Sequence, residues 1–145
     1  EQVSSWVWEY IDERGNIFLE GHQRDIEEYF AAIDVLVFPS HREGFGNVLI
    51  EAQAMGVPVV SYEIPGPIDA MVDNVTGLFV KPYDTEDLFD KMFQLIDKEY
   101  RKVLSQNSRA YIEKHFDVNI LVEHIWKRKI ELLRKYGRKL TDNNH

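Results

Sequence analysis

Short apolar runs alternate with amphipathic stretches along the first 98 residues of the chain. The apolar runs at residues 17–19, 35–38, 56–61 and 77–80 are rich in Val, Ile, Leu and Phe, and they predict strands, the third of them preceded by a turn at Gly56. Residues 3–11 form an amphipathic stretch. Residues 25–32, 46–55 and 84–98 predict helices, the last of them capped by Asp84 with Asp87 three residues on. The remainder is expected to be helical, with an apolar stripe formed by Leu121, Val122, Ile125, Trp126, Ile130 and Leu133.

The alternation of continuous apolar strands with helices indicates a parallel sheet covered on both faces. We therefore predict a Rossmann-like, doubly wound α/β architecture. In such folds ligands bind beyond the carboxyl ends of the strands, where loops lead into helix N-termini. The loop that follows residues 35–38 is accordingly the first candidate for a site.

The amino-acid composition argues against several classes of protein function. The chain has 145 residues, the size of one domain, and its 44% apolar and 29% charged residues are ordinary for a globular protein. Cysteine is absent, which excludes disulfides and thiolate metal sites and fits the cytoplasm. No apolar run approaches the length of a membrane span, and no signal pattern is present. The net charge of −8 argues against a nucleic-acid surface but leaves room for a small phosphorylated ligand held by backbone amides.

The segment from Pro39 to Ala52 carries the candidate chemistry. Its glycines at positions 44 and 46 let backbone approach a ligand closely, and the first amides of the next helix are free donors for an anion. Glu43 in the loop and Glu51 in the helix suit sugar hydroxyls on either side of a pyrophosphate, since carboxylates repel phosphate. One carboxylate–hydroxyl hydrogen bond contributes about 1.5–3 kcal/mol.

This segment resembles the group 1 (family 4) retaining glycosyltransferases, which have a two-domain B-type fold. Their signature is Pro-Ser, two variable residues, Glu-Gly-Phe-Gly, a second Glu eight positions after the first, Ala, and a Gly-x-Pro-Val-Val strand. The matching residues are Pro39, Ser40, Glu43 to Gly46, Glu51, Ala52 and Gly56 to Val60. With a further similar stretch at residues 74–82, the resemblance covers roughly residues 16–98. It is most like enzymes that build bacterial capsule or surface polysaccharides.

The resemblance implies a role for each matched residue. Glu43 is the catalytic candidate, expected to hold hydroxyls of the transferred sugar and to stabilise the charge that develops there. Glu51 is expected to accept hydrogen bonds from the ribose, and His22 to lie near the base. The donor-binding residues whose amides face the diphosphate are Gly44, Phe45, Gly46, Asn47 and Val48. The family needs no metal cofactor, because protein donors stabilise the leaving diphosphate. We expect a UDP-sugar donor, transfer with retention, and a polysaccharide or lipid-linked acceptor.

The resemblance also implies that the chain is part of a donor-binding domain. The N-terminal acceptor domain and the first two strands of the donor domain, which would lie between residues 17–19 and 35–38, have no counterpart here. We therefore expect the sheet to re-pair its strands, to associate with a second copy, or to be marginally stable, and the fragment to be inactive alone. Residues 64–69 depart from the family's paired glycines and Glu, which puts the sugar-side contacts there in question.

Other interpretations stay open. A non-catalytic nucleotide-sugar-binding or assembly module would keep the same motif, whereas an epimerase or phosphorylase on a similar fold would need a catalytic histidine or a cofactor lysine that we do not find. The histidines at 22, 41, 115 and 124 lack metal-ligand spacing. The basic C-terminal helix would suit peripheral contact with the inner face of a membrane. Packing against the N-terminal domain is the interpretation we favour for this helix. For Trp6, Trp8 and Trp126 we favour a packing role over a stacking platform.

Overall fold

The computed structural model describes residues 4–141. Within them, seven helices and three strands follow one another along the chain. Their order is α1 (Ser5–Asp12), α2 (Ile26–Ala32), β1 (Leu36–Phe38), α3 (Asn47–Ala54), β2 (Val59–Tyr62), α4 (Pro67–Ala70), β3 (Gly77–Val80), α5 (Thr85–Gln94), α6 (Lys98–His115) and α7 (Val118–Thr141).

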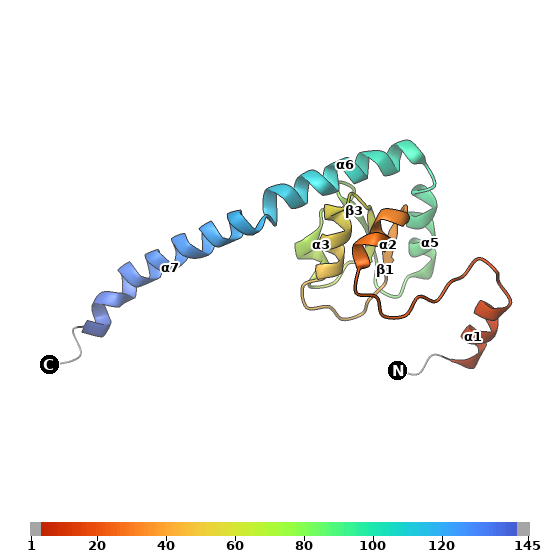
Figure 1. Cartoon of the computed structure of the whole chain (residues 1–145), viewed down its shortest axis with the longest axis horizontal. Coiled ribbons are helices and arrows are strands. Elements are labelled where there is room, and N and C mark those ends of the chain that lie inside the picture. The colour runs from red at the N-terminus through yellow and green to blue at the C-terminus, as the bar shows by residue number, and fades with distance from the viewer. Residues whose placement is uncertain (1–3, 142–145) are drawn as a thin grey trace.

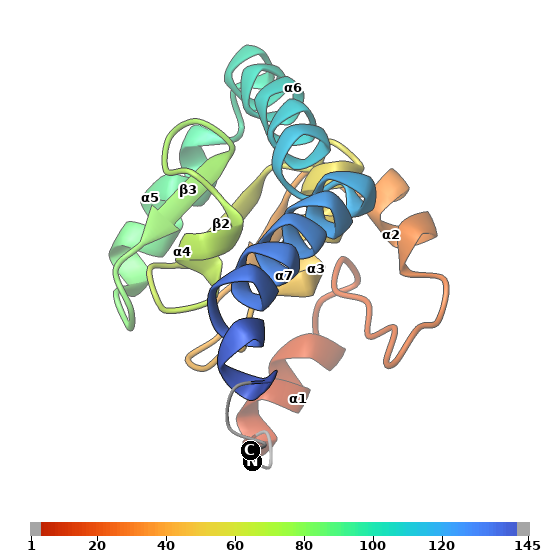
Figure 2. The same ribbon diagram turned by 90° about the vertical axis from the view of Figure 1, so that its left-hand side faces the viewer.

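The three strands form one parallel sheet in the order β1-β2-β3, which confirms the predicted α/β class. Leu36 lies opposite Val59, and Val59 lies opposite Gly77, so the strands are in register from their amino ends. Helices connect the parallel strands, as crossover connections must. Figure 2 shows α5 on one side of the sheet and α3 with α2 on the other.

Each face of the sheet has its own apolar core, and β2 contributes to both. Val59 packs with residues of α2, α3 and the α4 region, including Phe30 and Leu49. Val60 and Tyr62 point to the opposite face, where Leu78 and Leu95 are buried with them. Because successive side chains of a strand point to opposite faces, a strand buried on both faces is expected to be largely apolar. All four residues of β2 are buried.

The prediction of a strand at residues 17–19 is wrong. This segment is irregular, and Phe18 and Leu19 are 78% and 59% exposed. A strand needs a neighbour for its backbone N–H and C=O groups, and no strand of the described chain lies beside this one. Re-pairing of the three remaining strands is not seen either, since β1 pairs with β2 alone. Association with a second copy and marginal stability stay predictions.

The predicted helix at residues 84–98 ends earlier than expected, because α5 covers Thr85–Gln94 and α6 begins only at Lys98. Asp84 caps α5 as expected, since its side chain accepts a hydrogen bond from the Asp87 N–H. The chain then breaks after Gln94, and Asp97 caps α6 by accepting from the N–H groups of Glu99 and Tyr100. An Asp in this position competes for backbone donors and so favours a new helix start over continuation.

The C-terminal helix α7 extends away from the body, and α1 lies apart from it at the end of an irregular segment (Figure 1). The expectation that the three tryptophans are packing residues stays a prediction, because the described part of the chain leaves all three exposed. Trp6, Trp8 and Trp126 are 66%, 47% and 56% exposed. Most of the predicted apolar stripe of α7 is exposed as well, including Val122, Ile125, Ile130 and Leu133. The stripe residue Leu121 lies outside the residues whose side chains the structure describes.

Candidate functional site

The loop between β1 and α3 lies at the carboxyl edge of the sheet, where the fold predicts a ligand site. Gly46 is the N-cap of α3 and adopts a left-handed conformation, with φ 80° and ψ 48°. A Cβ atom at this position would overlap the Leu49 side chain. Only glycine therefore combines this backbone turn with close packing against the helix it begins.

Two amides at the start of α3 are available to a ligand. The first intrahelical bonds run from the Leu49 and Ile50 N–H groups to the Gly46 carbonyl. The N–H groups of Asn47 and Val48 have no acceptor among the described residues. First-turn amides and the helix dipole together favour an anion. The geometry of these two predicted donor-binding residues thus suits a phosphate group.

The Gly44 amide, which we expected to be free for the diphosphate, already has a hydrogen-bond partner. It donates to the Glu43 carboxylate, with 3.1 Å between the Gly44 nitrogen and Glu43 Oε1. Two predicted ligand-binding groups therefore satisfy each other across one peptide. The Gly44 amide can reach a diphosphate only after the Glu43 side chain turns away from it, for example toward a sugar hydroxyl.

The two carboxylates differ in their surroundings. Glu43 is half-buried in the loop, whereas Glu51 is exposed on α3, about one helical turn beyond the N-terminus. The predicted aromatic member of the motif, Phe45, is 44% exposed and packs against Phe116 at the end of α6, with 5.9 Å between ring centroids. The free amides of α3 thus lie between two carboxylates along the chain, that of Glu43 in the loop and that of Glu51 in the helix.

Of the predicted site residues, His22 alone is not joined to this loop. It is exposed in the irregular segment that precedes α2, and no hydrogen bond or ring contact links it to residues 39–51 within the described chain. Arg42 is also exposed, and its carbonyl accepts a hydrogen bond from the Ser40 hydroxyl at 2.9 Å.

The structure adds a residue that the motif did not include. Gly66, before α4, has φ 97°, and a Cβ atom there would lie 2.9 Å from the Gly44 carbonyl oxygen and 3.2 Å from that of Glu43. Gly66 therefore lies directly against the backbone of the candidate loop. The Pro-Gly-Pro run at 65–67 indicates a turn, but the sequence does not say which loop this turn contacts. The contact exists because β1 and β2 are neighbours, so that the loops after them meet.

The helices α3 and α4 are also joined by a buried side chain. Gln53, which is fully buried, donates from Nε2 to the carbonyls of Leu49 and Ala70, both at 3.0 Å. Its Oε1 has no hydrogen-bond partner among the described residues. Because buried amides are costly unless bonded, these two bonds hold the helix after the candidate loop against the helix after Gly66.

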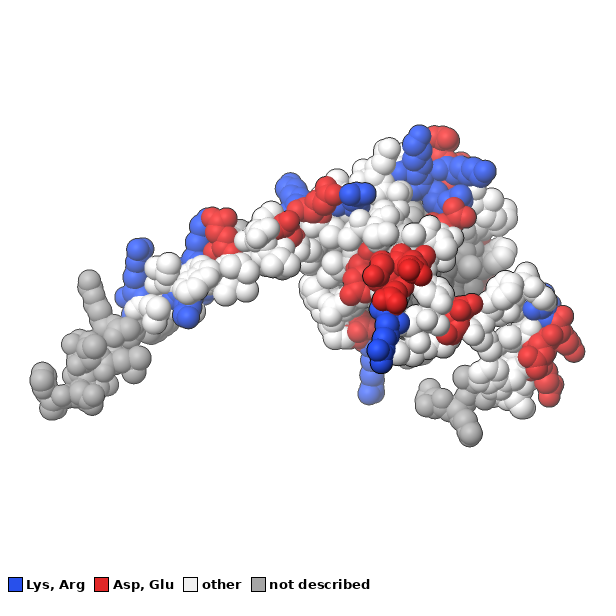
Figure 3. Space-filling model, in the orientation of Figure 1, with Lys and Arg blue, Asp and Glu red and all other residues white. Residues whose placement is uncertain are grey.

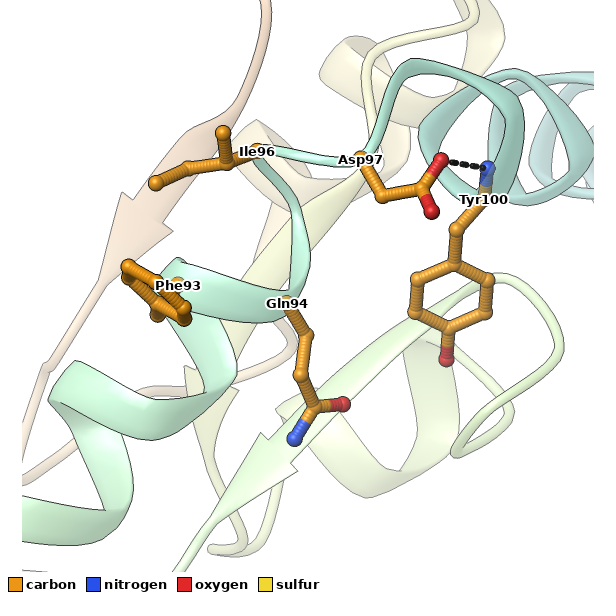
Figure 4. Close-up of a pocket in the computed structure, with 5 residues that line it drawn as sticks. All are labelled: Phe93, Gln94, Ile96, Asp97 and Tyr100. Carbon is orange, nitrogen blue, oxygen red and sulfur yellow. Dashed lines mark hydrogen bonds between the residues drawn. The ribbon is translucent and has the colours of Figure 1, made fainter.

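A separate hollow of about 440 Å³ lies between the end of α5 and the start of α6 (Figure 4). Its lining is Phe93, Gln94, Ile96, Asp97 and Tyr100. Burial raises the pKa of the Tyr100 phenol above 10.0, and the Asp73 carboxylate raises it further, so the phenol stays neutral at physiological pH. Helices of this fold run back from the carboxyl edge of the sheet, so this hollow lies at the opposite edge from the candidate loop.

Charge is unevenly distributed over the surface. Acidic side chains gather over α2, and Lys and Arg side chains stand out along α7 (Figure 3). Glu27 and Glu28 belong to the first turn of α2. No helix within residues 4–141 combines the length and the apolar character needed to cross a membrane.

Comparison with known proteins agrees with the fold. Residues 4–111 match the family described as glycosyl transferases group 1, and the chain therefore belongs to that family. CapM of Staphylococcus aureus, a capsular polysaccharide biosynthesis glycosyltransferase, is 37% identical over 117 residues, which cover 80% of this chain and 31% of CapM. The chain thus spans about a third of the length of this relative.

Solved structures show the same arrangement of strands and helices. HepE from Anabaena, in complex with UDP, is similar with a TM-score of 0.72 and 27% identity, over 76% of this chain and 31% of HepE. The C-terminal domain of LpcC, a group 1 family glycosyl transferase from Francisella tularensis, is similar with a TM-score of 0.62 and 27% identity. That match covers 70% of this chain and 53% of the LpcC domain.

Proposed function

We propose that this chain binds the nucleotide-sugar donor, a UDP-sugar, of a glycosyltransferase that adds a sugar to a polysaccharide or lipid-linked acceptor with retention of configuration. In this proposal the chain is part of the C-terminal, donor-binding domain. Acceptor binding belongs to an N-terminal domain, and the chain by itself does not catalyse transfer. The similarity to CapM supports a polysaccharide product, and the similarity to HepE, solved with UDP, supports the nucleotide.

The observation that carries the proposal is the pair of free amides at the start of α3, with one carboxylate before them and another after. The amides of Asn47 and Val48 would donate to the diphosphate. As the bond to the sugar breaks, negative charge grows on the leaving diphosphate, and fixed donors aimed at it stabilise that transition state. This arrangement requires no metal ion for the diphosphate.

The two carboxylates would bind different parts of the nucleotide-sugar donor. Glu43 would accept hydrogen bonds from hydroxyls of the transferred sugar and stabilise the positive charge that develops on its ring. That contact would release the Gly44 amide, which now donates to Glu43, for the diphosphate. Glu51 would accept from the ribose hydroxyls, and His22 would approach the base only if its segment moves toward the loop.

Titration of UDP, GDP and ADP into the 145-residue chain, followed by amide NMR shifts, tests the proposal. UDP should shift the amides of residues 44–48 selectively. Glu51→Ala should weaken UDP binding about tenfold, because a hydrogen bond to a charged group is lost. EDTA should leave the affinity unchanged.

The matched control is Glu99→Ala, which removes an exposed carboxylate from the first turn of α6, at the opposite edge of the sheet. It should bind UDP as the unaltered chain does. Equal binding by Glu51→Ala and the unaltered chain would contradict the role of Glu51. Absence of nucleotide-dependent shifts in both this chain and the full-length enzyme would contradict the proposed function.

A further inference from the structure

Three aromatic rings meet at the carboxyl edge of the sheet, one from the end of each strand. Tyr62 is the last residue of β2 and is buried, His41 lies in the loop after β1, and Tyr83 follows β3. The His41 and Tyr83 rings are stacked, with centroids 4.4 Å apart and planes inclined by 12°. Tyr62 lies 5.4 Å from His41 and 6.4 Å from Tyr83. The three rings therefore form a compact triangle.

Tyr83 occupies a backbone conformation that suits glycine. Its φ is 66°, and among the non-glycine residues of the described chain only Asn74 shares a positive φ. Such conformations are unfavourable for bulky side chains and persist only where the surroundings impose them. Tyr83 as a whole is 74% exposed, so burial of its side chain does little to offset this unfavourable conformation. What the tyrosine adds at this position is its stacking on His41 and its tilted contact with Tyr62.

His41 transmits that contact to the candidate loop. It lies two residues before Glu43, inside the turn in which the Ser40 hydroxyl donates to the Arg42 carbonyl. The position of the imidazole ring is therefore coupled to the turn that leads into Glu43. Elsewhere in the same loop, the backbone at Glu43 and Gly44 lies against Gly66, and the Phe45 ring contacts the Phe116 ring.

We propose that Tyr83 is a positioning residue for the donor loop, acting through the ring of His41. The triangle connects the end of β3 to the loop after β1 across Tyr62, and it limits the conformations of residues 40–44 before any ligand arrives. A loop that is already ordered loses less entropy on binding, so its affinity for a ligand is higher. The effect on donor binding rests on the proposed function, whereas the effect on the order of the loop does not.

Amide order parameters of the free chain test the positioning directly. In the unaltered chain and in Tyr83→Phe, which keeps the ring, residues 41–44 should have values near the rigid limit of about 0.85. In Tyr83→Ala they should fall below about 0.6, the range of flexible backbone. UDP affinity should fall about three- to tenfold in Tyr83→Ala and stay unchanged in Tyr83→Phe.

Tyr83→Gly separates positioning from stability. Glycine relieves the unfavourable φ, so this variant should unfold at a higher urea concentration than Tyr83→Ala while its loop is as mobile as that of Tyr83→Ala. The matched control is Phe89→Ala on α5, which removes an exposed ring stacked on Phe93 at 6.0 Å and should leave residues 41–44 ordered.

Unchanged order parameters at residues 41–44 in Tyr83→Ala would overturn the inference, whatever UDP does. Equal mobility of this loop in Phe89→Ala and Tyr83→Ala would overturn it as well. Loss of loop order in Tyr83→Ala, in a chain that binds no nucleotide even at full length, would instead overturn the proposed function and leave the positioning by Tyr83 intact.

Discussion

The consecutive helices α6 and α7 have similar patterns and opposite surroundings. Both are long, with 18 and 24 residues, and both carry apolar positions at helical spacing. In α6 that stripe is buried, with Leu104 and Ile112 at 0% and 6% exposure, and the helix packs along α3. In α7 the corresponding side chains are exposed, as at Ile125 and Leu133 with 64% and 58%. An apolar stripe therefore predicts a helix reliably, but it does not say whether a partner covers it.

The comparison predicts a large difference between two leucines. Leu104→Ala should lower the free energy of unfolding by about 2–5 kcal/mol, because it leaves a cavity in the core. Leu133→Ala should change it by less than about 0.5 kcal/mol, as is usual for an exposed position. Urea unfolding of both variants measures the difference. A large loss of stability in Leu133→Ala would mean that the apolar face of α7 is covered in solution.

A smaller effect should separate two glycines, one in the body and one in the segment that follows α1. Gly66→Ala should lower the free energy of unfolding by about 1–3 kcal/mol, since alanine would be strained at φ 97° and its Cβ would clash with the Gly44 carbonyl. Gly15→Ala should be almost neutral, because no atom lies within 4 Å of its added Cβ. Urea midpoints give the stabilities, and the amide shifts of residues 43–46 should move only in Gly66→Ala. Movement of those shifts in both variants would contradict the contact.

The smallest effect concerns the caps of the two helices. Asp97 accepts from two amides at the start of α6, and Asp117 accepts from the Asn119 N–H at 2.7 Å at the start of α7. Asp97→Ala should lower the free energy of unfolding by about 1 kcal/mol. Asp117→Ala should leave this free energy nearly unchanged and reduce helicity in α7, because α7 contributes little to the packed core. Circular dichroism with urea unfolding distinguishes the two, and equal losses of stability would contradict the difference in packing.

The part of the fold that could be predicted is the part in which each element carries its own signal. The runs that became β1, β2 and β3 are mostly apolar, because β2 and most of β3 are buried and β1 is half-buried. The start of α5 could be predicted from Asp84, because its side chain caps the helix by a local hydrogen bond from the Asp87 N–H. Residues 17–19 have the same apolar character and form no strand, because pairing depends on a neighbour that a run of three residues cannot specify.

The candidate loop was only partly predictable. Its glycines and carboxylates were found because a strand end, a glycine turn and a helix start are adjacent in sequence. The contacts that hold the loop come from elsewhere in the chain: Gly66 after β2, Tyr83 after β3 and Phe116 after α6. The pairing of Glu43 with the Gly44 amide was also hidden, because it depends on a side-chain rotamer.

Local patterns in the chain predicted most of the strands and helices, the edge of the sheet at which a ligand is expected, and the candidate binding residues from Glu43 to Glu51. Hydrophobic periodicity and capping act over a few residues, so they can be read along the chain. The tertiary structure decided which loops meet, which amides remain free, and which of two similar helices is buried. Those outcomes depend on strand order and on distant partners, and contacts between residues far apart in the chain leave no local pattern in it.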